Sequence, residues 1–368
     1  MSSSDVLSVL PPFMGPQFDR LLQELSADAV RTDRSGEWPA AQFESLARAG
    51  VLGWVIPRRY GGGELSGEAL VYGYERLAEA CLTTAFILTQ RNGGCQRIAG
   101  CDQESLKEEL LPQLARGEIF ATVGISHLTT SRQHTGRPAV VANATDDAIR
   151  LNGLIPWVTG AAAADYVVTG GTCEDGRQIL VALPTDRPGI HVQPPADLLA
   201  LNGSQTASID IQNVELDRRF LLAGPVEGVM QQGQGGGTGS VATSSLAVGL
   251  CVRTVAILSA EAQSRGDLKA AVEQFTAELA ELRRDLYAAA RGECTEQTPH
   301  LSNGSIRRRS NSLALRTTQA LMAASKGAGF VAGHPAERSV RESMFFLVWS
   351  CPQPLMEAAL REFACLSD

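Results

Sequence analysis

A block of short β-type runs in the middle of the chain, flanked on both sides by helical patterns, constrains the fold more than any other feature. The runs lie between about residues 120 and 222, and clusters of Gly, Pro, Asp or Asn separate them. Runs of this kind are typical of an antiparallel barrel or sandwich. They are 120–123, 139–142, 149–151, 166–168, 179–182 and 208–211. We therefore predict an α+β multidomain protein with a central antiparallel β domain over residues 121–224.

The first 120 residues form a predicted helical domain. Apolar residues recur every three to four positions near its start, which indicates one buried helix face. They are Phe18, Leu21, Leu22 and Leu25. A second helix is predicted from Trp38 to Gly50, and a third over 106–114. Between them, residues 70–88 have the pattern of one long apolar helix.

Residues 225–368 form a second predicted helical domain, which a flexible connector over 232–239 precedes. A helix rich in Ala, Ser and Val is expected over 241–262, and its small side chains favour close packing between helices. Residues 272–289 carry apolar side chains at spacings of three and four, so this helix is expected to bury one narrow seam. Another small-residue helix is predicted over 313–328.

Charge and cysteine usage argue against several classes of function. The net charge of -8 gives no support for nucleic acid or an anionic membrane as a partner, and the arginine run at 307–309 is interpreted as solvated rather than as a phosphate site. No uninterrupted apolar run reaches the roughly 18 residues that span a bilayer, and the start of the sequence lacks the pattern of a signal peptide. The eight cysteines form no C-x-x-C pair, and the five histidines do not cluster at ligand spacing. These features predict reduced thiols, a cytoplasmic location and no metal site.

The stretch 151–166 is the strongest candidate for a binding site. Asn152-Gly153 is a turn signal, and a β-type run that carries Trp157 and Thr159 follows it. The alanines at 161–164 leave space for another flat surface. A Trp beside a β-branched alcohol and a small-residue loop suits a flat aromatic ligand that forms hydrogen bonds. The alternative is an ordinary core Trp at a corner of the sheet.

This stretch resembles a segment of the acyl-CoA dehydrogenase superfamily. In that family a sequence close to L-N-G-x-K-x-W-I-T-N-G lies in the central β domain against the flavin ring. The matching positions are Leu151, Asn152, Gly153, Trp157, Val158 and Thr159, and Ile155 stands where the family usually has Lys. The resemblance implies an N-terminal helical domain, a central antiparallel β barrel or sandwich, and a C-terminal helical bundle. It also implies a flavin that contacts Trp157, Val158 and Thr159.

Three further positions are implied as flavin contacts by the resemblance. Ser126 falls where the family has a Thr at the flavin, whereas His127 replaces a family Glu and has an ordinary loop histidine as its alternative. Arg265 matches the start of R-x-F-G, which reaches the cofactor of a neighbouring subunit, and Gly327 begins a match to a glycine-rich segment. Because the positions around the flavin tail match poorly, FAD is the implied cofactor and FMN is its alternative. The family architecture implies a homodimer or a homotetramer.

The position of the family's catalytic carboxylate holds a serine. Counting from the glycine-rich segment, the family's Y-E-G falls on Trp349, Ser350 and Cys351. In most members that Glu removes the α proton of an acyl thioester while hydride leaves the β carbon for the flavin. A serine hydroxyl cannot accept this proton near neutral pH without a base of its own. The second location that the family uses, around 238–240, has no carboxylate here.

Three functions are therefore compared. The first is a flavin-dependent oxidoreductase of the acyl-CoA dehydrogenase type that acts on a CH–CH bond of a small molecule such as an acyl-CoA, with a non-standard base. The second is a flavin-dependent monooxygenase on the same scaffold, which needs no Glu at Ser350. The third is a catalytically silent binding protein of this fold.

Overall fold

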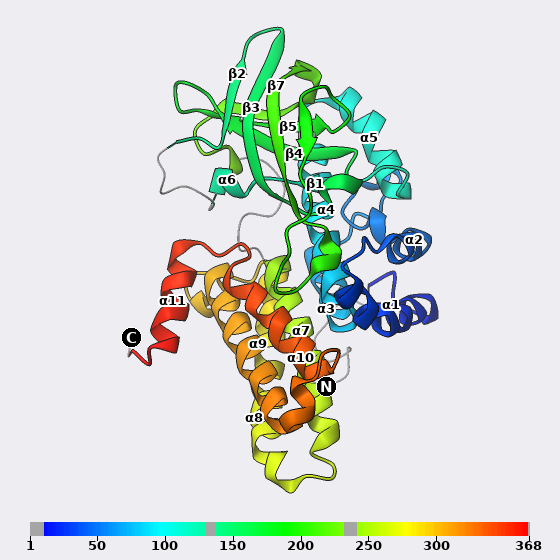
Figure 1. Cartoon of the computed structure of the whole chain (residues 1–368), viewed down its shortest axis with the longest axis vertical. Helices are drawn as coiled ribbons and strands as arrows, with labels where there is room; N and C mark the ends of the chain where they lie inside the picture. The colour runs from blue at the N-terminus through cyan, green and yellow to red at the C-terminus, as the bar shows by residue number, and fades with distance from the viewer. Residues whose placement is uncertain (1–10, 130–136, 232–240, 367–368) are drawn as a thin grey trace.

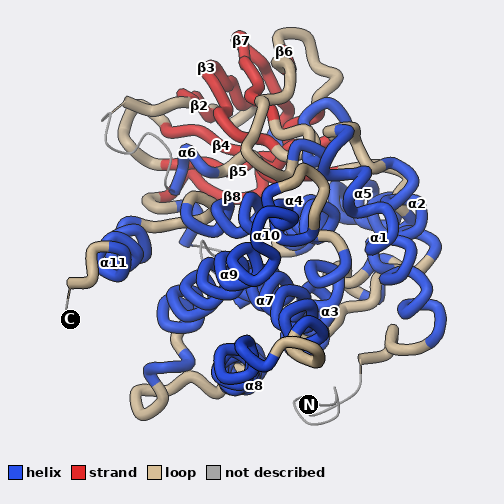
Figure 2. The backbone as a smooth tube through the Cα atoms, turned by 60° about the horizontal axis from the view of Figure 1, so that its bottom comes forward, coloured by secondary structure: helices blue, strands red, loops and turns tan. Residues whose placement is uncertain are grey.

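The computed structural model describes residues 11–129, 137–231 and 241–366 of the 368-residue chain. Figure 1 shows N-terminal helices, a β domain at one end of the molecule and a C-terminal helical bundle at the other. Figure 2, with helices and strands coloured separately, shows that the strands gather in one region and the helices surround it on one side. This order confirms the predicted fold class. The connector at 232–239 and the segment at 238–240 lie outside the described residues.

The described N-terminal residues, from 11 onward, form five α-helices. They are α1 (Pro16–Ser35), α2 (Ala40–Arg48), α3 (Gly67–Ala80), α4 (Leu82–Ala99) and α5 (Glu104–Arg116). The four apolar residues predicted to share one face of α1 are all buried. α1 ends at Gly36, whose φ of 64° is the left-handed conformation common after a helix C-terminus. The predicted amphipathic helix at the start of the chain is thus confirmed.

The apolar stretch 70–88 is not one helix. Cys81 has φ -149° and ψ 105°, which is extended backbone, and it separates α3 from α4. Both helices are buried on most sides, so their apolar pattern continues across the break and gives no sign of it. The prediction of a single helix was therefore wrong. The break turns α4 toward the β domain, where it packs against β1 (Ala121–Val123).

The β domain is built on one eight-stranded sheet. Its remaining strands are β2 (Val140–Ala144), β3 (Ala148–Val158), β4 (Tyr166–Thr172), β5 (Gln178–Pro184), β6 (Ile190–Val192), β7 (Ala207–Asp217) and β8 (Leu221–Val226). The order is β6-β7-β3-β2-β4-β5-β8, and β1 pairs with β4. The pairings β1–β4 and β2–β4 are parallel and the others are antiparallel, so the sheet is mixed and the prediction of a purely antiparallel β domain was wrong on this point. The short helix α6 (Ser126–Thr129) follows β1.

Asn152-Gly153 does not form the predicted turn. Both residues lie inside β3, which runs continuously from Ala148 to Val158. The register against β7 shifts between Leu151 and Gly153, and Gly153 has φ 138°. A Cβ atom at Gly153 would stand 2.1 Å from the carbonyl oxygen of Ala139. The glycine therefore allows a bulge and a close strand contact, not a chain reversal.

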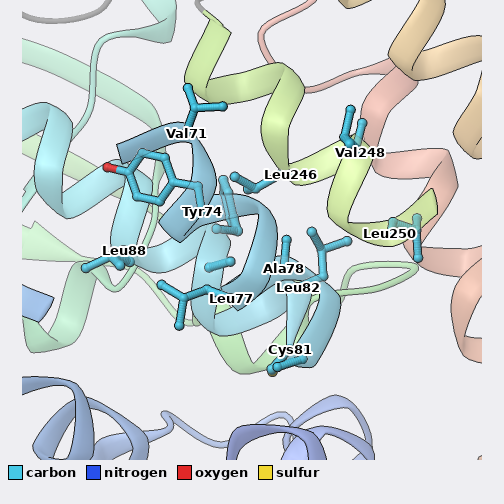
Figure 3. Close-up of a cluster of buried hydrophobic side chains, with 14 of the residues drawn as sticks. Val71, Tyr74, Leu77, Ala78, Cys81, Leu82, Leu88, Leu246, Val248 and Leu250 are labelled. Atoms are coloured by element: carbon cyan, nitrogen blue, oxygen red, sulfur yellow. The ribbon is translucent and has the colours of Figure 1, made fainter. Parts of the chain in front are cut away.

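Over residues 241–366, the C-terminal bundle contains five α-helices. They are α7 (Val241–Glu261), α8 (Lys269–Ala290), α9 (Asn303–Ser325), α10 (Pro335–Met344) and α11 (Gln353–Phe363). α7 packs against α3 and α9, and Figure 3 shows Leu77 of α3 and Leu246 of α7 in this core. A Cβ atom at Gly249 would lie 2.4 Å from the carbonyl oxygen of Glu75, so only glycine permits this approach. This confirms the close packing expected of a small-residue helix.

α7 also has the length and composition of a membrane-spanning helix. Its most apolar window has a mean hydropathy of 1.8, and 67% of that window is buried inside the protein. Burial between α3 and α9 accounts for this apolar composition. That the chain has no membrane partner stays a prediction.

The arginine run at 307–309 is not a solvated basic patch. It lies inside α9, where the helical period sends the three side chains in different directions. Arg307 is fully buried, Arg308 is exposed, and Nη1 of Arg309 donates to Asp285 of α8 at 2.5 Å. The prediction was wrong for Arg307 because its burial depends on the segment after α10, which packs over it.

Candidate functional site

A cavity of about 1050 Å³ lies between the β domain and both sets of helices. Its walls come from α3, α4, α6, the end of β3, the loop 198–201, the first turn of α7 and residues 344–350. Cavities for single small ligands usually measure roughly 300 to 1000 Å³. This cavity therefore has room for a flat cofactor ring together with a second small molecule.

The β-domain wall of the cavity carries Ser126, Trp157 and Thr159. The register of β3 against β7 shifts between Ile155 and Val158, and at this irregularity the side chain of Trp157 remains 50% exposed. Thr159 is buried and accepts a hydrogen bond from the Thr206 hydroxyl at 3.4 Å. The structure thus brings three of the predicted flavin-ring residues to one wall.

Val158 does not belong to this wall. Its side chain is fully buried in the core of the β domain and does not line the cavity. Successive side chains on a strand point to opposite faces, so Trp157 and Val158 cannot both face the same ligand with their side chains. The predicted flavin contact of Val158 stays a prediction, and the backbone of Val158 rather than its side chain would have to make it.

His127 is a buried helix residue and not a loop histidine. It lies in α6, and its Nε2 is 3.0 Å from the carbonyl oxygen of Gly170 in β4. Burial lowers the pKa of the His127 imidazole, and the contact with Gly170 opposes this shift. The side chain lies inside the β domain and does not line the cavity.

The helical wall of the cavity is aromatic. Phe86 comes from α4, Phe345 from the single turn η12 (Phe345–Leu347), and Trp349 follows that turn. The ring centroids of Phe86 and Phe345 are 4.7 Å apart, and those of Phe86 and Trp349 are 5.2 Å apart. Phe345 and Trp349 stack at 5.1 Å with 15° between their planes. These three rings join helices far apart in the sequence into one surface.

Ser350 lies at the end of this helical wall and lines the cavity. Its φ is 48°, in the left-handed region that residues other than glycine seldom adopt. The preceding carbonyl group, that of Trp349, accepts a hydrogen bond from Nη2 of Arg307 at 2.8 Å. The predicted position of the family base thus faces the same space as Trp157 and Thr159, and it carries a hydroxyl group.

None of the described residues that line the cavity is an Asp or a Glu. The stretches 130–136 (TSRQHTG) and 232–240 (QGQGGGTGS), which border described lining residues, contain no carboxylate in their sequences. The charged lining residues are Arg97 and Arg341. Burial lowers the pKa of Arg97 to about 10, so it remains a cation at neutral pH.

Arg341 and Tyr74 give the cavity wall its remaining ionisable groups. Nη1 of Arg341 donates to Asp33 of α1 at 3.0 Å and to the carbonyl oxygen of Leu199 at 3.3 Å, and its guanidinium also pairs with Glu337. These two carboxylates raise the pKa of Arg341 and neutralise its charge. The Tyr74 hydroxyl accepts a hydrogen bond from Asn92 at 2.8 Å, and burial raises the pKa of this phenol. Neither side chain is a proton acceptor at neutral pH.

The structure does not bring Arg265 and Gly327 to this cavity. The first residues of α7 and α9 line the cavity, whereas Arg265 and Gly327 follow the opposite ends of these helices. At 1.5 Å per residue, helices of this length place them about 30 Å away. Arg265 donates from Nη1 to the carbonyl oxygen of Ala324 at 2.7 Å, and Ala324 is three residues before Gly327, so the two predicted residues lie near each other.

A flavin ring fits the β-domain wall. The Ser126 hydroxyl oxygen is buried and has no hydrogen-bond partner among the described residues, and Trp157 offers an exposed flat ring. An isoalloxazine ring needs both a flat apolar contact and polar partners at its edge. Ser126, Trp157 and Thr159 would hold it there.

The fold and the site together define a three-part scaffold with its cavity between the β domain and the helices. Residues 18–118 match the family model described as "Acyl-CoA dehydrogenase, N-terminal domain". The chain belongs to the acyl-CoA dehydrogenase superfamily, whose members are flavin-dependent oxidoreductases.

Among curated relatives, the probable acyl-CoA dehydrogenase YngJ of Bacillus subtilis (strain 168) is 27% identical over 69% of this chain and 68% of its own length. The dibenzothiophene monooxygenase of Rhodococcus qingshengii is 27% identical over 56% of this chain and 50% of its own length. The chain thus spans between one half and about two thirds of these relatives. Both are distant.

Solved structures agree with this assignment of the fold. The butyryl-CoA dehydrogenase of Megasphaera elsdenii superposes with a TM-score of 0.81 at 18% identity, covering 96% of this chain and 99% of that one. KijD3, solved in complex with FMN and a dTDP-sugar, superposes with a TM-score of 0.78 at 18% identity, covering 100% and 98% of the two chains. At these identities the likeness establishes the fold alone.

Sequence reasoning missed most of the helical wall. Phe86 and Phe345 were not singled out, because their meeting depends on packing across some 260 residues of chain. Tyr74, Arg97 and Arg341 were not predicted as lining residues either. The family resemblance pointed only to Trp349 and Ser350, through the position of the missing carboxylate.

Proposed function

We propose that this protein is a flavin-dependent oxidoreductase that binds the flavin ring against Ser126, Trp157 and Thr159. The support is one cavity that joins these residues to Ser350, the predicted position of the superfamily base. When bound, the flavin supplies a two-electron redox centre. The proposed cofactor is FAD, with FMN as the alternative, because Arg265 and Gly327 lie too far away to contact a flavin tail within the same chain.

Two reactions are candidates within this class. Superfamily membership favours oxidation of a CH–CH bond in an acyl thioester or a similar substrate. That reaction needs a group that accepts the α proton. The described cavity lining offers the Ser350 hydroxyl, the Tyr74 phenol and two guanidinium groups, and none of these accepts a proton at neutral pH. Among the described lining residues, the first candidate reaction therefore has no side chain that could accept the α proton.

Since no Asp or Glu occurs among the described lining residues, the site favours the second candidate, monooxygenation with reduced flavin and molecular oxygen. In this reaction one oxygen atom enters the substrate and the other leaves as water, with the two electrons supplied by the reduced flavin. No α proton of an acyl thioester has to be removed. We therefore propose monooxygenation of a small molecule as the function that the site supports best, and acyl thioester oxidation as the alternative.

The proposal is tested on the purified protein in two steps. The absorbance spectrum and the identity of the released flavin establish whether FAD or FMN is bound. The holoprotein is then mixed without oxygen with acyl-CoA substrates of several chain lengths. We expect little bleaching of the flavin in this step, and we expect reoxidation of the reduced holoprotein to respond to a bound substrate. Rapid bleaching by an acyl-CoA would establish the alternative, and a protein without flavin affinity would support a silent binding role.

A further inference from the structure

The aromatic wall of the cavity is formed by Phe86, Phe345 and Trp349. The proposed function gives these three rings no role. Trp157, Thr159 and Ser126 lie on the β-domain wall, whereas the aromatic wall belongs to the helices. The cavity volume of about 1050 Å³ leaves space for a second molecule beside a flavin ring. The aromatic wall would face that molecule.

Burial shows that two of these rings are not ordinary core residues. Phe346 is fully buried, while its neighbour Phe345 and the nearby Trp349 are only partly buried and line the cavity. Phe86, which is 5% exposed, supports both from behind in edge-to-face contacts. The chain therefore presents a preassembled pair of stacked rings to the cavity, with little rotational freedom left to lose when a ligand binds.

The charges around the wall indicate the character of the ligand. The described lining carries no carboxylate, so a cationic ligand has no counter-charge there. Arg341 is neutralised by Asp33 and Glu337, and most side chains beside the aromatic wall are apolar, as Met344 and Leu347 are. Aromatic pairs gain stability beyond their buried area when rings meet edge to face or in offset stacks. Such a surface prefers a flat ring to a saturated molecule of the same carbon skeleton.

We propose that the substrate of this protein is a flat aromatic molecule without a positive charge that binds against Phe345 and Trp349 of the helical wall, while Trp157 lies on the β-domain wall. This inference rests on the proposed function in one respect: it assumes that the flavin occupies the β-domain wall. Trp349 is the main specificity residue, because Arg307 fixes its backbone and Phe345 fixes its ring plane.

The test compares two probes with the same carbon skeleton, 2-naphthol and its fully saturated counterpart 2-decalol. Their Kd values for the holoprotein are measured by titration calorimetry without turnover. We expect 2-naphthol to bind about tenfold more tightly, since each aromatic contact contributes up to about tenfold beyond its area. Phe345→Leu and Trp349→Leu should bring the ratio of the two Kd values close to one.

Met344→Leu is the matched control, because Met344 lines the same cavity with an apolar side chain that has no ring. It should keep the preference for 2-naphthol. Equal Kd values in the parent protein, or no binding of 2-naphthol, would overturn the inference. Flavin content is read by absorbance on the same samples, so loss of flavin binding would count against the proposed function alone. Circular dichroism identifies a variant that fails to fold. In that case the ratio of the two Kd values in the parent protein still tests the inference.

Discussion

Arg307 contacts Trp349 in two ways: its Nη2 donates to the Trp349 carbonyl oxygen at 2.8 Å, and its guanidinium carbon lies 5.4 Å from the ring centroid. Arg307 is fully buried, and its Nε and Nη1 have no hydrogen-bond partner among the described residues. Burial lowers the pKa of this guanidinium to about 10. A buried cation with few partners costs stability, so its benefit is the placement of Trp349.

Replacing Arg307 with Met should therefore separate stability from placement. We expect the free energy of unfolding of Arg307→Met, measured in urea, to lie within about 1 kcal/mol of the parent value or above it, because an unpaired buried charge is removed. The ¹⁹F resonance of fluorinated Trp349 should broaden as the ring loses its anchor. Arg308→Met, at an exposed neighbour in the same helix, should change neither measurement. A loss of more than about 3 kcal/mol in Arg307→Met would show that Arg307 has a stabilising partner.

Trp157 should control flavin retention. Trp157 is 50% exposed and lines the cavity, so removal of its ring takes away ligand contact without opening the core. We expect Trp157→Ala to lose bound flavin while its circular dichroism spectrum stays unchanged. Trp157→Phe keeps a ring and should retain most of the flavin. An unaltered flavin stoichiometry in Trp157→Ala would refute the assignment of this wall.

Ser350→Glu should introduce the missing proton acceptor. A carboxylate base usually contributes about 100- to 10,000-fold in rate, so we expect a measurable gain in flavin reduction by acyl-CoA substrates under anaerobic conditions. The left-handed backbone at Ser350 strains a glutamate about as much as it strains the serine, so it should add little to any change in the free energy of unfolding. Ser350→Gln, of the same size and without a charge, is the control. Equal activity in both variants would mean that no thioester reaches this position.

His127 should make the fold sensitive to mild acid. Burial lowers the pKa of its imidazole below the usual value of 6.5. As the pH falls below about 6.5, the unfolded chain takes up a proton that the folded chain does not, and the free energy of unfolding decreases. Each unit of difference between the two pKa values contributes about 1.4 kcal/mol. Tm measured at pH 7.5 and pH 5.5 should differ less in His127→Asn than in the parent protein, whereas His191→Asn, at an exposed position, should respond like the parent.

α11 should take part in assembly of the homodimer or homotetramer. It has no buried residue within the chain, and Met356, Leu360 and Phe363 are 45%, 57% and 54% exposed. Spacings of four and three place these side chains on one helix face, and exposed apolar faces of this kind mark interaction surfaces. We expect Leu360→Asp to lower the mass measured by light scattering and Glu357→Gln to leave it unchanged. A parent protein that is monomeric at micromolar concentration would contradict the predicted assembly.

The helix, sheet and helix order could be predicted because each part shows its own local periodicity. The breaks within these parts could not. Cys81 interrupts a pattern that stays apolar on both sides, and Gly153 resembles a turn residue although it allows a bulge. Local sequence records which residues favour a conformation, but not which neighbouring strand or helix is close enough to make that conformation necessary.

The two walls of the site also differ in how far the local sequence could predict them. Trp157 and Thr159 are two residues apart on one strand, so a short motif could point to them. The contact between Phe86 and Phe345, and the burial of Arg307 beneath the segment after α10, arise from packing between distant parts of the chain. An arginine in a run of three gives no local signal that it is the buried one.

The lengths of α7 and α9 have a consequence for how cofactor binding depends on concentration. Arg265 and Gly327 lie about 30 Å from the cavity of their own chain. If they contact a flavin, it must therefore be the flavin held by another copy of the chain. Each chain would then supply the ring wall of one site and the tail contacts of a second, so sites would be completed only in pairs. Dilution that separates the copies would release flavin from every site at once. Flavin release and the fall in mass by light scattering would share a midpoint, and retention of flavin by separated chains would exclude such shared sites.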